Sequence, residues 1–68
     1  MKTVDARGLS CPQPVILARK AIEAGQFPFE VLVDTVTSRE NVRRMAEKAG
    51  CKVAVVQTGD EFRLKLAR

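Results

Sequence analysis

Residues 5–14 read DARGLSCPQP, and the pattern predicts that Cys11 lies between a loop and the start of a helix. Gly8 lies in the loop, and the residues after Cys11 open an apolar stretch with helical periodicity. A helix N-terminus favours an anion, because it carries unpaired N–H groups and the positive end of the helix dipole. A thiolate at Cys11 is therefore expected to be stabilised, and Cys11 is the candidate nucleophile.

Two prolines narrow and stiffen this predicted anion site. Pro12 is expected at the first helical position and Pro14 two residues later, and neither supplies an amide N–H. The backbone amides of Gln13 and Val15 remain as the predicted donors to the sulfur. Proline also fixes φ and restricts the residue before it, so we expect Cys11 to be held rigidly.

Further along the chain, the hydrophobic pattern predicts the order β-α-β-α-β-β. We expect strands at residues 2–6, 29–34, 51–58 and 61–66, and amphipathic helices at residues 12–24 and 37–49. Gly25 and Gly50 follow the two helices as C-terminal stops. Residues 37–40, Thr-Ser-Arg-Glu, have the spacing of a capping box that opens the second helix. Gly59-Asp60 suits a two-residue type II′ hairpin between the last two strands.

This order predicts one domain over residues 1–68 with an α/β (α+β) fold. Right-handed crossovers place both helices on one face of a four-stranded mixed sheet, which makes a two-layer sandwich. The other face has no covering element, so some apolar residues are expected to be partly exposed there: one of Leu32 and Val33, and some of Ala54, Val55 and Val56. A partner, a further domain, self-association or a mildly apolar open face would each account for such a surface.

Composition excludes several classes of protein. The 68 residues contain no histidine, the usual zinc ligand and commonest general base, so we expect no metal, no cofactor and no Cys–His hydrolysis. Two cysteines are too few for a disulfide scaffold, and no apolar run approaches the ~20 residues of a membrane helix. We therefore expect a cytoplasmic protein without a membrane partner. The net charge of +4 suits a polyanion or an acidic protein surface, and equally an ordinary solvated surface.

The two cysteines are not expected to act together. Pro14 occupies the position of the second cysteine in a Cys-x-x-Cys redox motif. Cys51 opens a strand at the opposite edge of the predicted sheet, whereas a disulfide needs Cα atoms within ~7 Å. We interpret Cys51 as a half-buried core residue. Transfer of a sulfane sulfur needs no local resolving thiol, so Cys11 suits a persulfide carrier, and a purely structural helix cap is the alternative.

A docking surface is predicted around the cysteine from Arg7, Ile16, Arg19 and Lys20. Ile16 breaks the polar face of its helix, which indicates either docking or a single exposed apolar side chain, and Arg7 also fits a solvated loop. Two other functions stay open. One is a nucleic-acid-binding or regulatory module using basic residues of the second helix, although Glu40 and Glu47 interrupt them and tyrosine and tryptophan are absent. The other is a redox sensor that forms intermolecular disulfides through Cys11.

The stretch DARGLSCPQP resembles the signature Asp-x-x-Gly-x-x-Cys-Pro-x-Pro of the TusA/SirA/YedF family of sulfur-carrier proteins. The predicted element order resembles that family over nearly the whole chain. The resemblance implies a two-layer sandwich and a persulfide-accepting cysteine at Cys11, with Asp5, Gly8, Pro12 and Pro14 as the other motif positions. It also implies a cysteine desulfurase as donor and a sulfur-relay protein as acceptor, which in TusA leads to 2-thiolation of tRNA. Direct binding of nucleic acid is not implied.

Residues 34–42, DTVTSRENV, look more like the amino-terminal domain of YedF-like proteins associated with selenium metabolism. The likeness extends to the basic helix that follows and to Gly50-Cys51. It implies selenium as an alternative cargo. Such proteins often continue into another domain, so the chain is expected to be either a free-standing family member or one domain of a longer protein. Asp34, Arg39 and Asn41 fall in this segment, and the resemblance assigns no catalytic role to them.

Overall fold

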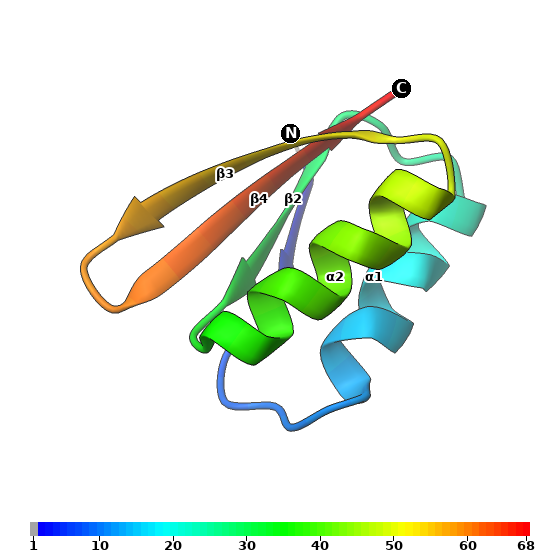
Figure 1. Cartoon of the computed structure of the whole chain (residues 1–68). Helices are drawn as coiled ribbons and strands as arrows, with labels where there is room; N and C mark the ends of the chain where they lie inside the picture. The colour runs from blue at the N-terminus through cyan, green and yellow to red at the C-terminus, as the bar shows by residue number, and fades with distance from the viewer. Residues whose placement is uncertain (1) are drawn as a thin grey trace.

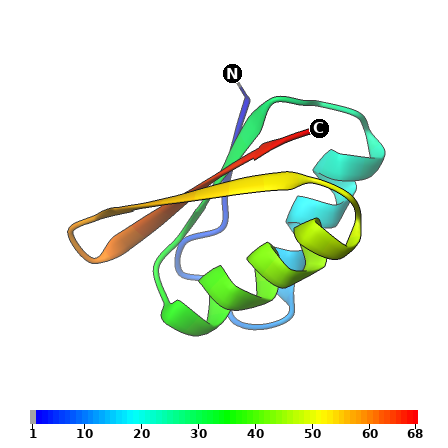
Figure 2. The same cartoon turned by 45° about the horizontal axis from the view of Figure 1, so that its top comes forward.

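A computed structural model describes residues 2–68 and contains the six predicted elements (Figure 1). Their bounds are β1 (Lys2–Asp5), α1 (Gln13–Glu23), β2 (Phe29–Val33), α2 (Val36–Lys48), β3 (Lys52–Thr58) and β4 (Glu61–Ala67). The strands form one sheet in the order β1-β2-β4-β3, and both helices lie on the same face of it (Figures 1 and 2). The predicted two-layer α+β sandwich with a four-stranded mixed sheet is confirmed.

β2 and β4 are the two central strands of the sheet. β1 and β2 are parallel, with Val4 opposite Val31, whereas β4 runs antiparallel to both β2 and β3. β4 enters between β2 and β3, so β3 becomes an edge strand. The β3–β4 hairpin extends beyond the helices (Figure 2). Because β1 and β2 are parallel neighbours, the loops that leave their carboxyl ends meet at one edge of the sheet.

The core lies between the sheet and the helices. Alternate residues of β2 and β4 face the helices and are buried: Phe29, Val31, Val33, Phe62, Leu64 and Leu66. The helices contribute mainly small side chains: Ala18, Ala21, Ile22, Val42 and Ala46. Cys51 is 7% exposed and belongs to this core, as its interpretation as a packing residue predicted. Neither helix within residues 2–68 has the length and hydrophobicity of a membrane span.

Both helices end at the predicted glycines. After α2, Gly50 has φ +85° and donates its amide to the Glu47 carbonyl at 3.0 Å, and Cys51 donates to the Ala46 carbonyl at 3.0 Å. The same pair of bonds closes α1 around Gly25, which has φ +68°. Only glycine adopts this left-handed conformation without a steric penalty, which accounts for the stops.

The start of α2 differs from the prediction. Its cap is Thr35, whose extended backbone carries a side-chain oxygen that accepts the Ser38 amide at 3.0 Å. The predicted capping box at Thr37 is wrong by two residues. Glu40, its expected acidic member, pairs instead with arginines of its own helix.

The face without helices is mixed rather than apolar. By strand register it holds Leu32, Ala54 and Val56, with Glu30, Arg63 and Lys65 between them. Of the alternatives Leu32 and Val33, the register places Leu32 there and Val33 in the core. Val55 lies on the helix side of β3 and is 39% exposed. Charged side chains therefore lie among the apolar residues of this face. Two of them form an ion pair, in which Arg63 Nε lies 3.6 Å from a Glu30 carboxylate oxygen.

Candidate functional site

Two hydrogen bonds join the loop before Cys11 to the carboxyl end of β2 and the residue that follows it. The Ala6 amide donates to the Leu32 carbonyl at 2.9 Å, and the Gly8 amide donates to Asp34 Oδ2 at 2.9 Å. Gly8 has φ +76°, a conformation that side-chain-bearing residues rarely adopt. The motif thus places a glycine where the chain must turn, and Asp34, which follows β2 and lies outside the motif, supplies the acceptor that holds the turn.

Arg7 connects the same loop to two strands. Its guanidinium contacts both Asp5 carboxylate oxygens, at 2.9 and 2.8 Å, and Glu61 at 3.2 Å. These hydrogen bonds lower the pKa of Asp5 to about 2. The single positive charge of Arg7 thus lies between two carboxylates, one on β1 and one on β4, and the side chain links these two strands. The structure gives Arg7 no contact with Cys11 and does not support it as a second positive group there.

The first turn of α1 departs from the predicted anion site. Pro12 is the N-cap rather than the first helical residue, and Pro14 is buried in the first turn. The peptide bond between Cys11 and Pro12 is cis. The Gln13 amide donates to the Ser10 carbonyl at 2.9 Å, so it does not face the sulfur as predicted. Within residues 2–68, no backbone amide forms a hydrogen bond with Cys11 Sγ.

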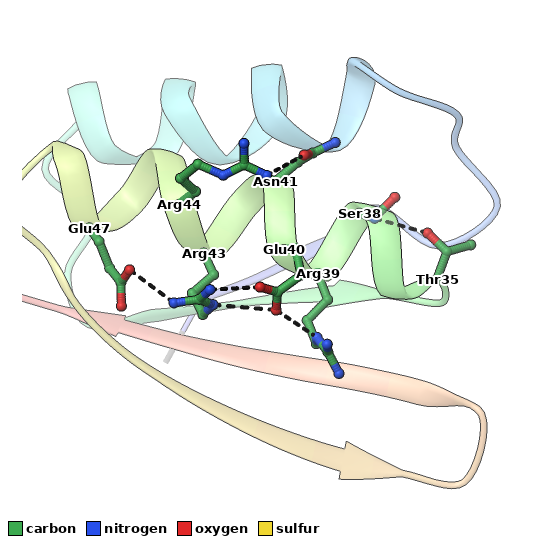
Figure 3. Close-up of polar contacts among 8 residues, drawn as sticks. All are labelled: Thr35, Ser38, Arg39, Glu40, Asn41, Arg43, Arg44 and Glu47. Carbon is green, nitrogen blue, oxygen red and sulfur yellow. Dashed lines mark hydrogen bonds and ion pairs between the residues drawn. The ribbon is translucent and has the colours of Figure 1, made fainter.

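A side chain of α2 contacts the sulfur instead. Asn41 Nδ2 donates to the exposed Cys11 Sγ at 3.7 Å. Arg44 Nη2 donates to Asn41 Oδ1 at 3.3 Å, so the amide presents its NH₂ group to the sulfur. Figure 3 shows Asn41 and Arg44 on the side of α2 that faces α1. Sequence reasoning gave Asn41 no role, since only the packing of the two helices brings it to Cys11.

A groove of about 700 Å³ runs between α1 and α2, with Cys11 in its lining. Its apolar residues are Pro12, Val15, Ile22, Met45 and Ala49, and its polar residues besides Cys11 are Arg19, Glu23, Asn41, Arg44 and Lys48. Of the predicted docking residues, Arg19 lies in this groove. Ile16, which is 45% exposed, and Lys20 line a smaller depression of about 310 Å³ with Leu9, Gln13 and Leu17. The predicted docking residues on α1 therefore divide between two depressions.

The opposite side of α2 is electrically balanced. Arg43 contacts Glu40 at 2.6 Å and Glu47 at 3.0 Å, and Arg39 contacts Glu40 at 3.0 Å (Figure 3). Hydrogen bonds from Arg43 lower the pKa of Glu40, and Glu40 in turn raises the pKa of Arg43. Arg39 also lies 4.8 Å above the centroid of the Phe62 ring. Much of the basic charge of this helix is thus engaged within the molecule, which weakens the interpretation as a nucleic-acid-binding helix.

Sequence comparisons point to the same family that the motif around Cys11 resembles. A family model described as Sulfurtransferase TusA matches residues 2–68. Two relatives are named as putative sulfur carrier proteins. The one from Archaeoglobus fulgidus is 38% identical over 52 residues, covering 74% of this chain and 68% of the relative. The one from Methanocaldococcus jannaschii is 35% identical over 72 residues, covering 100% of this chain and 95% of the relative.

A solved structure supports the same conclusion. The crystal structure of a SirA-like protein from Desulfitobacterium hafniense superimposes with a TM-score of 0.86 and 34% sequence identity. The match covers 97% of this chain and 95% of that one. The family match over residues 2–68 and this shared fold lead to one assignment. The chain belongs to the TusA family of sulfurtransferases.

Proposed function

We propose that this protein is a sulfur carrier in which Cys11 accepts a sulfane sulfur as a persulfide and passes it to an acceptor thiol. The observation that carries the proposal is the exposed Cys11 Sγ, which lies beside a groove and accepts a hydrogen bond from Asn41. Membership of the TusA family and the names of the two relatives support the same function.

The loading step is an exchange at sulfur. The Cys11 thiolate attacks the outer sulfur of a donor persulfide, a new S–S bond forms, and the donor's own S–S bond breaks. The donor cysteine leaves as a thiolate, and Cys11 then carries S–SH. Discharge repeats the exchange: an acceptor thiolate attacks the outer sulfur, and Cys11 leaves as a thiolate. Neither step requires an external oxidant or reductant.

The surroundings of Cys11 favour this carrier chemistry over dithiol redox chemistry. The other cysteine, Cys51, is buried beyond the far end of α2, so it cannot resolve a persulfide on Cys11. Anions formed at Cys11 during loading and discharge lie at the N-terminus of α1, where the helix dipole stabilises negative charge. Asn41 adds a donor that suits the same anions.

We further propose a cysteine desulfurase as donor, a sulfur-relay protein as acceptor and the cytoplasm as location. The cytoplasm keeps thiols reduced, which this exchange requires. The resemblance of residues 34–42 to YedF-like proteins supports selenium as a second cargo, because a selenium atom transfers by the same exchange.

The test uses a cysteine desulfurase and cysteine labelled at sulfur. We expect label on the wild-type protein and on Cys51→Ala, released in both by a reducing thiol, and no label on Cys11→Ser. Equal labelling of Cys11→Ser, or no label on the wild type, would refute the proposal. Mild oxidation distinguishes the redox-sensor alternative, which requires dimers linked through Cys11 and no bound label.

A further inference from the structure

We infer that the groove between α1 and α2 binds an acidic polypeptide segment, which brings the partner's reactive cysteine to Cys11. The inference rests on the proposed function and adds the chemistry by which the partner is recognised. It is drawn from the charges of the groove, from its apolar lining and from the position of Cys11.

The groove carries an excess of positive charge. Three cationic side chains line it, Arg19, Arg44 and Lys48, against one carboxylate, Glu23. None of the three cations forms an ion pair with a carboxylate within residues 2–68. Complementary carboxylates on a partner would both steer its approach and fix its register along the groove.

This excess is a local feature and not a general consequence of a basic composition. On the side of α2 toward the sheet, Arg39 and Arg43 are matched by Glu40 and Glu47 (Figure 3). On the side toward α1, Arg44 donates to the neutral amide of Asn41 and forms no ion pair with a carboxylate of residues 2–68. The same helix therefore neutralises its arginines away from Cys11 and leaves a guanidinium available beside it.

The lining favours a polypeptide over a nucleic acid. Five of the eleven lining residues are apolar, among them Ile22 and Met45, and a methionine adapts its shape to different apolar partners. No aromatic side chain is among the lining residues, so bases would find no stacking platform. A chain that alternates carboxylates with small apolar residues fits these surroundings.

Arg44 connects partner binding with the reacting atom. Its guanidinium holds the Asn41 amide, and that amide contacts Cys11 Sγ. A carboxylate bound at Arg44 would therefore lie two side chains from the sulfur. The groove volume of about 700 Å³ is within the range of about 300–1,000 Å³ typical of pockets for compact ligands, which suits a short segment.

The experiment uses a synthetic peptide with one cysteine flanked by glutamates, activated as a mixed disulfide with thionitrobenzoate. The Cys11 thiolate attacks the peptide sulfur, forms a disulfide with the peptide and releases the coloured thionitrobenzoate anion. A peptide with glutamines in place of the glutamates is the neutral reference. The ratio of the two rates cancels any change in the reactivity of Cys11 itself.

We expect the acidic peptide to react about tenfold faster than the neutral one at low ionic strength. The advantage should vanish near 1 M salt, where the screening length falls to about 3 Å. The double variant Arg44→Gln/Lys48→Gln should lose most of the rate advantage of the acidic peptide over the neutral one. The matched control, Lys52→Gln/Lys65→Gln, removes the same charge from the open face of the sheet and should keep it.

Equal rates for the two peptides would overturn the inference, as would an equal loss in the control variant. The same assay can include a competitor, either a single-stranded RNA oligonucleotide or the acidic peptide without the thionitrobenzoate group. If the RNA slows the reaction of the activated acidic peptide more strongly than the unactivated peptide does, the groove binds nucleic acid instead. These failures are distinct from failure of the proposed function. Sulfur loading on Cys11 with equal peptide rates refutes only the acidic partner, whereas absence of loading refutes the carrier.

Discussion

Asn41 Nδ2 on α2 donates a hydrogen bond to Cys11 Sγ, 3.7 Å away at the start of α1. The two residues are 30 positions apart in the chain, and the packing of α1 against α2 brings them together. Arg44, one turn further along α2, fixes the orientation of the amide. The surroundings of the sulfur thus depend on a helix–helix contact as well as on the local motif.

Removing the Asn41 amide should slow the reactions of Cys11. We expect Asn41→Ala to react about fivefold more slowly with iodoacetamide at fixed pH, as the loss of one hydrogen bond worth about 1 kcal/mol implies. Asn41→Asp should be slower still, because a carboxylate repels the thiolate. The rates are measured in a Cys51→Ala background. The matched control is Gln57→Ala, which removes an amide from the β3–β4 hairpin, and an equal rate loss there would contradict this role for Asn41.

The N-cap of α2 gives a second test. Thr35→Ala should lower the free energy of unfolding by about 1 kcal/mol, because its hydroxyl oxygen accepts the Ser38 amide. Thr37→Ala, the matched control one half-turn into the helix, should change that free energy by no more than about 0.5 kcal/mol. Urea titration measures both. A larger loss for Thr37→Ala would restore the capping box predicted from the sequence.

Acid should weaken the tie between Arg7 and Asp5. The pKa of Asp5 is lowered from 3.8 to about 2, so its contribution to stability is complete above pH 3.8 and is lost as the pH falls through about 2. We expect the melting temperature of the wild type to exceed that of Asp5→Asn at pH 6, and the difference to disappear between pH 3.8 and about 2. Salt should reduce the difference, since the pair is exposed. A difference that persists below this range would contradict the assignment.

Most of the architecture could be predicted because each element carries its own periodicity. Phe62, Leu64 and Leu66 alternate with charged residues, and all three are buried in β4. Gly25 and Gly50 mark the helix ends because the left-handed conformation there is a local requirement. Local patterns of this kind need no knowledge of the tertiary contacts.

The remaining features depend on contacts between distant segments. Two threonines, Thr35 and Thr37, precede similar helical sequence; the capping-box spacing favours Thr37, whereas the structure caps α2 with Thr35. Asp34, which directly follows β2, accepts the Gly8 amide, and the spacing of residues in the sequence does not reveal this contact. Helical periodicity also does not reveal which flank of α1 meets α2, so Arg19 was grouped with Ile16 and Lys20 although they line different depressions.

Under the proposed function, Cys11 alone loads one sulfur atom and releases it again. Intact-mass spectrometry tests it on the matched variants Cys51→Ala and Cys11→Ser, after incubation with a cysteine desulfurase and cysteine and then after addition of an acceptor thiol. We predict that Cys51→Ala gains the mass of one sulfur atom and loses it to the acceptor, while Cys11→Ser gains none. A sulfur adduct on Cys11→Ser, or none on Cys51→Ala, would show that Cys11 is not the carrier residue.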